Sequence, residues 1–179
     1  MTATRVALWV VGALFVILLA TGIALAFRYR PDVSFGTRPA PSPLFTARRV
    51  HRLASFFFVP AVGMLAISSI GLFLVRRRSA YLAYPLSAGV AALAAAFTGF
   101  LLPWDQLGLR AVTVGTNMQG YVPILRGHDV RFVLIGTSEI TDAAFSRWFW
   151  LHAVALPLFL VATGVVVALK ARRSSTPAS

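Results

Sequence analysis

The chain contains no cysteine and few charged residues, and each shortage excludes a class of protein. With no cysteine among 179 residues, it can form no disulfide bond, thiolate metal site, cysteine-ligated iron–sulfur cluster or thioether-linked cofactor. Charged residues make up only 12% of the sequence, whereas about 25% of a soluble globular domain is charged. Hydrophobic residues make up 58%, and the mean hydropathy is +0.78. These values indicate a protein that lies largely within a lipid bilayer.

Acidic residues are especially scarce, because five of them stand against 17 lysines and arginines and leave a net charge of +12. A nucleic-acid-binding protein gathers such charge on one solvated face. Here the basic residues stand in short groups at the ends of apolar runs, as in Arg76–Arg78. Membrane topology explains this distribution better, so the lipid bilayer is an expected partner and nucleic acid is not.

Four apolar runs are long enough to cross the hydrocarbon core as helices, which takes about 20 residues. The first is too long for a secretory signal peptide, and no small-residue cleavage site follows it. The expected fold is therefore an all-α membrane protein, a four-helix transmembrane bundle formed by one domain over residues 1–179, with a long extracytoplasmic loop at 103–147. The expected helices cover about residues 6–27, 50–75, 80–102 and 148–169.

Alternation of the four helices places both termini and the Arg76–Arg78 turn on one side of the membrane. This side carries seven basic residues and no acid, whereas the opposite side carries ten arginines and all five acids. The positive-inside rule is counted over short loops and makes the first side cytoplasmic, although the total arginine count points the other way. The sequence thus predicts a multi-pass protein of the cell (inner) membrane with cytoplasmic termini.

Two histidines, His51 and His152, stand near the starts of the second and fourth runs. Both of these helices enter from the loop side, so the two imidazoles are expected at similar depth. Polar side chains at membrane depth usually face the bundle interior, and histidines on facing helices of a bundle suit axial ligation of a haem. The alternative is a pair of interfacial histidines that bond to water or lipid headgroups.

Longer motifs place the chain near a known family. It resembles the N-terminal half of cytochrome b, and most closely the four-helix subunit of chloroplast-type cytochrome bf complexes. The resemblance covers nearly the whole chain, and "GFLLPWDQ" is its most diagnostic stretch. The segments that carry it are "TGIALAFRYRP" (21–31), "FTGFLLPWDQLG" (97–108), "TNMQGYVPILRG" (116–127) and "RWFWLHAVALP" (147–157).

The resemblance implies that His51 and His152 are the axial ligands of a non-covalent haem b. It also places Arg48 and Arg52 near haem propionates, where a guanidinium can pair with a carboxylate; Arg147 is a weaker candidate for the same role. Each arginine can instead be a residue at the membrane edge that extends its charged end toward the headgroups.

Two further groups of residues are assigned by the same resemblance. Gly22 and Gly99 occupy positions where the family's helices approach the porphyrin, which requires a residue without Cβ. Asp105 is a candidate proton acceptor, or else an ordinary carboxylate in a solvated turn. The residues that resemble part of the family's outer quinol pocket are Pro103, Trp104, Asp105 and Gln106.

The departures from the family pattern concern a second haem. Typical members carry two histidines on each of two helices, 14 or 15 residues apart, and two similarly spaced glycines on each of the other two. Here the deeper position of every pair holds another residue, and Met64, the nearest other ligand, is one residue out of phase. The replacements are Leu65 on the second helix, Val166 or Val167 on the fourth, Leu8 on the first and Pro85 on the third.

These patterns predict one haem b on the extracytoplasmic side, in a non-autonomous electron-transfer subunit of a respiratory-type oxidoreductase. Electrons would pass between quinone or quinol and an extracytoplasmic redox partner. Expected partners are an iron–sulfur or cytochrome subunit and a second membrane subunit. One alternative is a membrane anchor or assembly subunit with a structural haem or none, and another is a quinone-binding module without net redox turnover.

Overall fold

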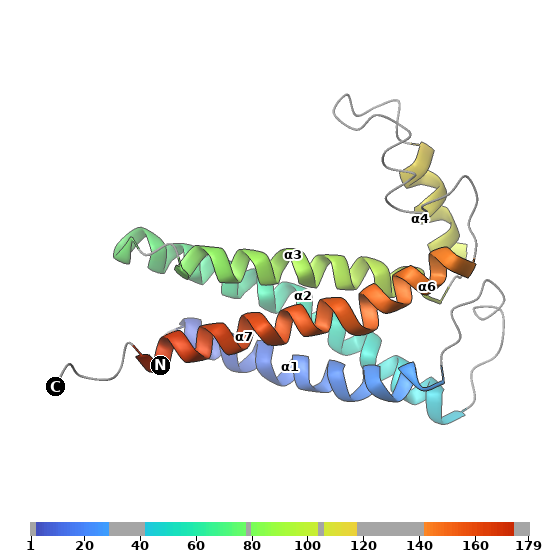
Figure 1. The fold of residues 1–179 in the computed structure, drawn as a ribbon, viewed down its shortest axis with the longest axis horizontal. Coiled ribbons are helices and arrows are strands. Elements are labelled where there is room, and N and C mark those ends of the chain that lie inside the picture. The colour runs from blue at the N-terminus through green and yellow to red at the C-terminus, as the bar shows by residue number, and fades with distance from the viewer. Residues whose placement is uncertain (1–2, 29–41, 78–79, 104–105, 118–141, 174–179) are drawn as a thin grey trace.

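The structure is a computed structural model in which four long helical segments run side by side (Figure 1). Apart from short turns, every segment that it describes is helical. The all-α, four-helix transmembrane fold expected from the sequence is therefore confirmed. The described residues are 3–28, 42–77, 80–103, 106–117 and 142–173.

Three of the four segments are single α-helices, and the fourth is a helix whose middle turn is π-helical. A separate shorter helix, α4, follows the third segment. The elements are α1 (Ala3–Ala26), α2 (Ser42–Arg76), α3 (Ala80–Leu101), α4 (Gln106–Asn117), α6 (Asp142–Trp150), η3 (Leu151–Ala155) and α7 (Leu156–Arg173).

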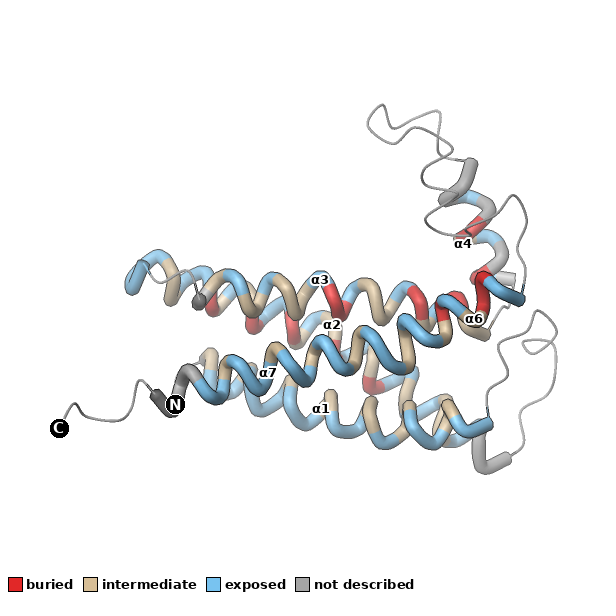
Figure 2. The backbone as a smooth tube through the Cα atoms, in the orientation of Figure 1, coloured by how far each residue is buried: buried red, intermediate tan, exposed pale blue. Residues whose placement is uncertain are grey.

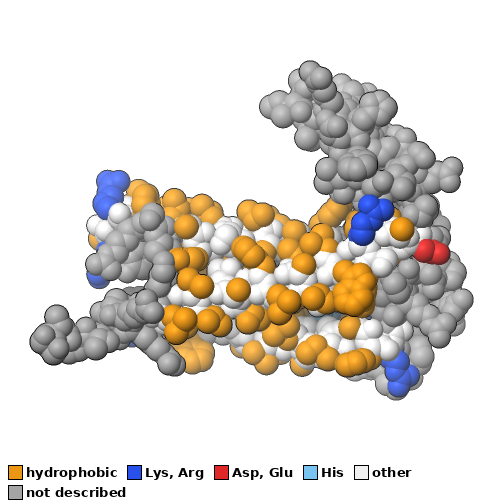
Figure 3. Space-filling model, in the orientation of Figure 1, with side chains coloured by type: hydrophobic (Ala, Val, Ile, Leu, Met, Phe, Trp, Pro, Cys, Tyr) orange, Lys and Arg blue, Asp and Glu red, His pale blue; other side chains and the backbone are white. Residues whose placement is uncertain are grey.

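Each of the four segments is long and apolar enough to cross a membrane. On the face seen in Figure 3, hydrophobic side chains are spread along the middle of the segments, and basic side chains lie near the two ends. Even large side chains face outward, such as Trp9 with 75% of its surface exposed and Ile67 with 71%. Apolar exposure on this scale suits contact with lipid rather than water. The chain is a multi-pass membrane protein.

Two helices start earlier than the apolar runs suggested. Helix α2 begins at Ser42 rather than near residue 50, and α6 begins at Asp142 rather than near residue 148. Both early turns are more polar than the runs that follow, so a criterion based on hydrophobicity does not detect them. Part of the expected loop at 103–147 is helical, namely α4 and the start of α6, and residues 118–141 lie outside the described part.

The segments have two distinct ends. The start of α1, the end of α2, the start of α3 and the end of α7 lie together at one end, and α4 and α6 lie at the other (Figure 1). We call these the turn end and the loop end. Helix α2 and the α6–η3–α7 segment both run from the loop end to the turn end, so residues early in each lie near the loop end.

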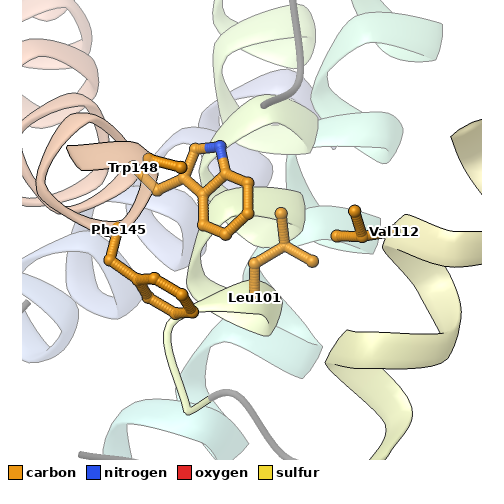
Figure 4. Close-up of a cluster of buried hydrophobic side chains, with 5 residues drawn as sticks. Leu101, Val112, Phe145 and Trp148 are labelled. Carbon is orange, nitrogen blue, oxygen red and sulfur yellow. The ribbon is translucent and has the colours of Figure 1, made fainter. Parts of the chain in front are cut away.

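Two hydrophobic clusters hold the bundle, and most of α1 and α7 stays exposed around them (Figure 2). The loop-end cluster joins α3, α4 and α6, and its Phe145 and Trp148 rings lie 5.2 Å apart (Figure 4). The loop-end cluster consists of Leu101, Val112, Ala144, Phe145 and Trp148.

The second cluster, the mid-bundle cluster, lies nearer the turn end and joins all four segments. Its buried residues are Phe58, Val62 and Ala92, and the Phe15 ring stacks on Phe58 at 6.0 Å. The partly buried residues packed against them are Val11, Leu14, Phe15, Leu18 and Leu160. Together these side chains fill the middle of the bundle with hydrocarbon.

The π-helical turn η3 has an identifiable local cause. Pro157 has no N–H group, so it cannot donate to the carbonyl of Ala153 one α-turn earlier. The backbone N–H of Leu156 instead reaches back five residues to the carbonyl of Leu151. This wider turn inserts one extra residue, and such π-bulges are frequent at functional sites. It contains His152.

Candidate functional site

The two histidines singled out in the sequence lie next to each other, between the two hydrophobic clusters. The ring centres of His51 and His152 are 6.1 Å apart and their planes meet at 71°. A metal bound between two imidazoles takes metal–nitrogen bonds of about 2 Å, which together with the two ring radii gives a centre-to-centre distance of about 6 Å. The observed spacing therefore suits one metal centre between the rings.

His51 is held by a hydroxyl group of the neighbouring helix α1. Its Nδ1 lies 2.9 Å from Oγ1 of Thr21. The Thr21 hydroxyl also lies 2.7 Å from the carbonyl of Ile17, to which it donates, and in that arrangement its oxygen accepts a hydrogen from Nδ1.

His152 is held in the same manner by α3. Its Nδ1 lies 2.9 Å from the carbonyl oxygen of Ala95 and 3.2 Å from Oγ1 of Thr98. A carbonyl can only accept, and the Thr98 hydroxyl donates to the carbonyl of Ala94 at 2.8 Å. Nδ1 of His152 must therefore carry the hydrogen, which leaves the lone pair on Nε2 for a metal.

Each of these threonines is followed directly by one of the two glycines predicted to give clearance. A Cβ atom at Gly22 would lie 3.3 Å from Cε1 of His51, and one at Gly99 would lie 2.6 Å from Cε1 of His152. By contrast, nothing lies within 4 Å of a Cβ built at Gly89. The glycines thus make room for the imidazole rings themselves, and their predicted clearance for a porphyrin stays a prediction.

The donor set fits the haem expected from the sequence. Within the described residues no group of three or more histidine, cysteine, aspartate or glutamate side chains could form a metal cage. Two neutral imidazoles with Nδ1 already bonded and Nε2 free are typical of axial ligands, whose second nitrogen is usually held by a carbonyl or similar acceptor. The remaining ligands of the metal would have to come from a macrocycle.

The three candidate arginines lie around the loop end of the site. Arg48 is half-buried and one turn before His51, whereas Arg52 and Arg147 are exposed. The Arg147 side chain donates from Nε to the carbonyl of Ala143 at 3.2 Å. Among the three, Arg48 is thus the best placed to meet a group bound between the helices, and a role toward propionates stays a prediction for all of them.

The predicted quinol-pocket residues are only partly described. Pro103 is half-buried directly after α3, and Gln106 is the first residue of α4. Trp104 and Asp105 lie outside the described residues. The pocket itself therefore stays a prediction.

Nearer the turn end lie the residues at the positions where typical family members would hold a second haem. Leu65 is buried with 8% of its surface exposed, and Met64 points outward with 67% exposed. Fifteen residues after His152, a count that includes the residue added at η3, Val167 is half-buried, whereas Val166 is 37% exposed. On the glycine-bearing helices, Leu8 is exposed and Pro85 half-buried.

Sequence reasoning missed the hydrogen-bond partners of the histidines. A partial signal was present as the dipeptide Thr-Gly, which occurs at Thr21-Gly22, Thr98-Gly99 and Thr163-Gly164; the first two bond to the histidines. It also missed the π-helical turn, whose signal is a proline five residues after His152. Each of these features lies within one helical turn of a residue that had been singled out.

Comparison with known proteins gives three similarities. Residues 4–174 match the family model described as Cytochrome b/b6/petB. The chain is 30% identical over 152 residues to a protein named cytochrome b6 from Bigelowiella natans, covering 80% of this chain and 70% of that one. Its fold matches a chain of a hyperthermophilic respiratory Complex III with a TM-score of 0.76 and 22% identity, over 100% of this chain and 49% of that one. The chain therefore spans about half the length of that solved chain.

Proposed function

The chain belongs to the cytochrome b/b6/petB family, and from that premise we propose that it is a membrane electron-transfer subunit with one haem b bound between His51 and His152. The observation that supports this most directly is the geometry of the pair. The rings are 6.1 Å apart, and each holds its Nδ1 against an acceptor on a neighbouring helix. Both Nε2 atoms are thereby kept available for iron.

When bound, the haem supplies one-electron chemistry, and the chain supplies its setting. The two histidines would bind the iron, and the helices that carry Thr21 and Thr98 orient them. The mid-bundle cluster excludes water on the turn-end side, and the loop-end cluster anchors α6, from which His152 follows. Arg48 is the proposed partner for a haem carboxylate.

We propose a single haem because the level beneath lacks ligands. Leu65, which is buried, and Val167, which is half-buried, stand where a second pair of histidines would be needed. The mid-bundle cluster also packs the space between the helices directly beyond the histidine pair. A second porphyrin would therefore lack axial ligands and would have to displace buried side chains.

The proposed orientation places the haem on the extracytoplasmic side of the cell (inner) membrane, with both termini in the cytoplasm. Electrons would pass between quinone or quinol and an extracytoplasmic redox partner, an iron–sulfur or cytochrome subunit. The similarity to a chain of a respiratory Complex III supports a multi-subunit setting, in which we propose a second membrane subunit as a partner. The residues at 103–106 are the proposed contribution to its quinol pocket.

The test is the haem content and reducibility of the purified protein. Wild type should carry haem b whose reduced alpha band grows when quinol is added, and His51→Ala and His152→Ala should each lose it. His128→Ala is the matched control, since it removes the third histidine of the chain. Retention of a low-spin haem at the wild-type ratio by either ligand variant would contradict the assignment.

A further inference from the structure

We propose that Thr21 and Thr98 are positioning residues that fix the tautomer of the two histidines and thereby set the redox potential of the haem. The inference rests on the proposed function, because it concerns how the same site is tuned. It is carried by two hydrogen-bond chains in which a helix carbonyl, a threonine hydroxyl and an imidazole follow one another. Both chains are built on the same local pattern, a threonine directly before a glycine.

The first step concerns the single hydrogen of each hydroxyl. Thr21 donates to Ile17 at 2.7 Å and Thr98 donates to Ala94 at 2.8 Å, each to the carbonyl four residues earlier. When that hydrogen points to the helix carbonyl, the threonine oxygen accepts from the imidazole, and we infer this arrangement for both threonines. A helical threonine thus becomes an acceptor whose direction is fixed by the helix backbone.

The second step concerns the histidine tautomer. An Nδ1 atom that faces an accepting oxygen must carry the ring hydrogen, so the lone pair lies on Nε2. For His152 the Ala95 carbonyl, 2.9 Å from Nδ1, requires the same tautomer independently. The protein therefore holds the rings in the tautomer that binds a metal through Nε2.

The third step links the hydrogen bond at Nδ1 to the redox potential of the haem. An acceptor at Nδ1–H makes the imidazole a stronger electron donor to iron, which favours the ferric state. Hydrogen bonds around the ligands are among the means by which a protein tunes haem potential. Removing the hydroxyl should therefore raise the midpoint potential.

The two threonine hydroxyl groups should differ in the size of their effect on the haem potential. The Thr21 hydroxyl lies 2.9 Å from its histidine and the Thr98 hydroxyl 3.2 Å from its own. In addition, the hydrogen on Nδ1 of His152 is shared with the nearer Ala95 carbonyl. Loss of the Thr21 hydroxyl should thus have the larger effect.

The experiment is potentiometric titration of the full chain with bound haem. Thr21→Val, which keeps the shape but removes the acceptor, should shift the ferric-to-ferrous ratio at fixed ambient potential by up to about tenfold, or ~59 mV for one electron. Thr98→Val should shift this ratio less. Thr21→Ser, which keeps the hydroxyl group, should give the wild-type ratio. Thr163→Val is the matched control, because Thr163 makes the same bond to a carbonyl four residues earlier, that of Phe159 at 2.9 Å, but lies on α7 beyond the site.

A second measurement needs no haem. Nitrogen NMR of histidine-labelled full chain without haem should show His51 and His152 hydrogenated on Nδ1, and Thr21→Val should mix the tautomers of His51. A wild-type protein that binds no haem would refute the proposed function. Haem retained at full stoichiometry with unchanged potential in both valine variants would overturn the role of the threonines and leave the proposed function standing.

Discussion

Gly99 lies against His152 so closely that a methyl group on its Cα would stand 2.6 Å from the Cε1 atom of the ring. Real Cβ atoms do not approach other heavy atoms at that distance. The ring cannot simply turn away, because its Nδ1 is bonded to the Ala95 carbonyl and the Thr98 hydroxyl. Residue 99 must therefore be a glycine for the imidazole to occupy its observed position.

Gly99→Ala should displace the His152 ring and sharply reduce haem content, and the larger Gly99→Leu should abolish haem binding while the four spans remain. Gly22→Ala should be milder, because its Cβ would lie 3.3 Å from the His51 ring. The measurement is haem per polypeptide in correctly inserted protein. Gly89→Ala is the control on α3, where the added methyl meets nothing and the helix should gain about 0.5–1 kcal/mol. Normal haem content in Gly99→Leu would refute the steric requirement.

A second haem should not be recruited by restoring its ligands alone. In the double variant Leu65→His with Val167→His, two polar side chains would face the bundle without partners, at a cost of about 1–3 kcal/mol each. The expected result is an unchanged ratio of one haem per chain and a lower unfolding temperature, measured by pyridine haemochrome assay and thermal melting. Val166→His, one residue out of register, is the control and should be tolerated better because that side chain is more exposed. A wild-type ratio near two would require an unrecognised ligand and would end the one-haem interpretation.

The absence of cysteine allows a clean test of orientation. A single cysteine introduced by Ser79→Cys, which lies between α2 and α3 in the sequence, should react with a membrane-impermeant reagent only from the cytoplasmic side. The reason is that three basic segments without acids lie at the turn end. A cysteine introduced at Arg110 of α4 is the opposite control and should react from outside. Reversed labelling would place the haem on the cytoplasmic side.

Arg77 adopts a left-handed backbone conformation with φ of 53°, directly after the end of α2. Its N–H donates to the carbonyl of Phe73 at 2.7 Å, so it closes the helix in the place that glycine usually takes. Arg77→Gly should raise stability by about 1 kcal/mol, measured as the thermal loss of haem absorbance in detergent. Arg76→Gly, within the helix, should lower it by about the same amount.

Much of the architecture could be predicted because the membrane simplifies it. A stretch of about 20 apolar residues has few alternatives to a spanning helix, and the four predicted segments are confirmed. The family resemblance is confirmed by the match to the family model. The pairing of His51 with His152 followed from helix alternation, which fixes depth. Helix starts such as Ser42 were missed because polar turns outside the hydrocarbon carry no hydrophobic signal.

The finer geometry could not be predicted for a different reason. The register of α7 depends on the one residue inserted at η3, so counting at a constant helical period left Val166 and Val167 equivalent. The contact between Gly99 and His152 depends on how closely α3 and the last segment approach, which is a tertiary property. The hydroxyl groups of Thr21 and Thr98 could have been outward-facing until the facing histidines were placed.

The mid-bundle cluster has a consequence for bioenergetics under the proposed arrangement. His51 lies six residues after Phe45, where its spanning segment starts, or roughly 9 Å along the helix, while the hydrocarbon around Phe58 and Val62 separates it from the turn end. An electron that enters and leaves at the loop end would cross only a small part of the transmembrane field. Moving one charge through the whole field takes about 2.3 kcal/mol per 100 mV, and this subunit would perform only a fraction of that work. Its redox equilibrium would therefore be nearly independent of whether the membrane is energised.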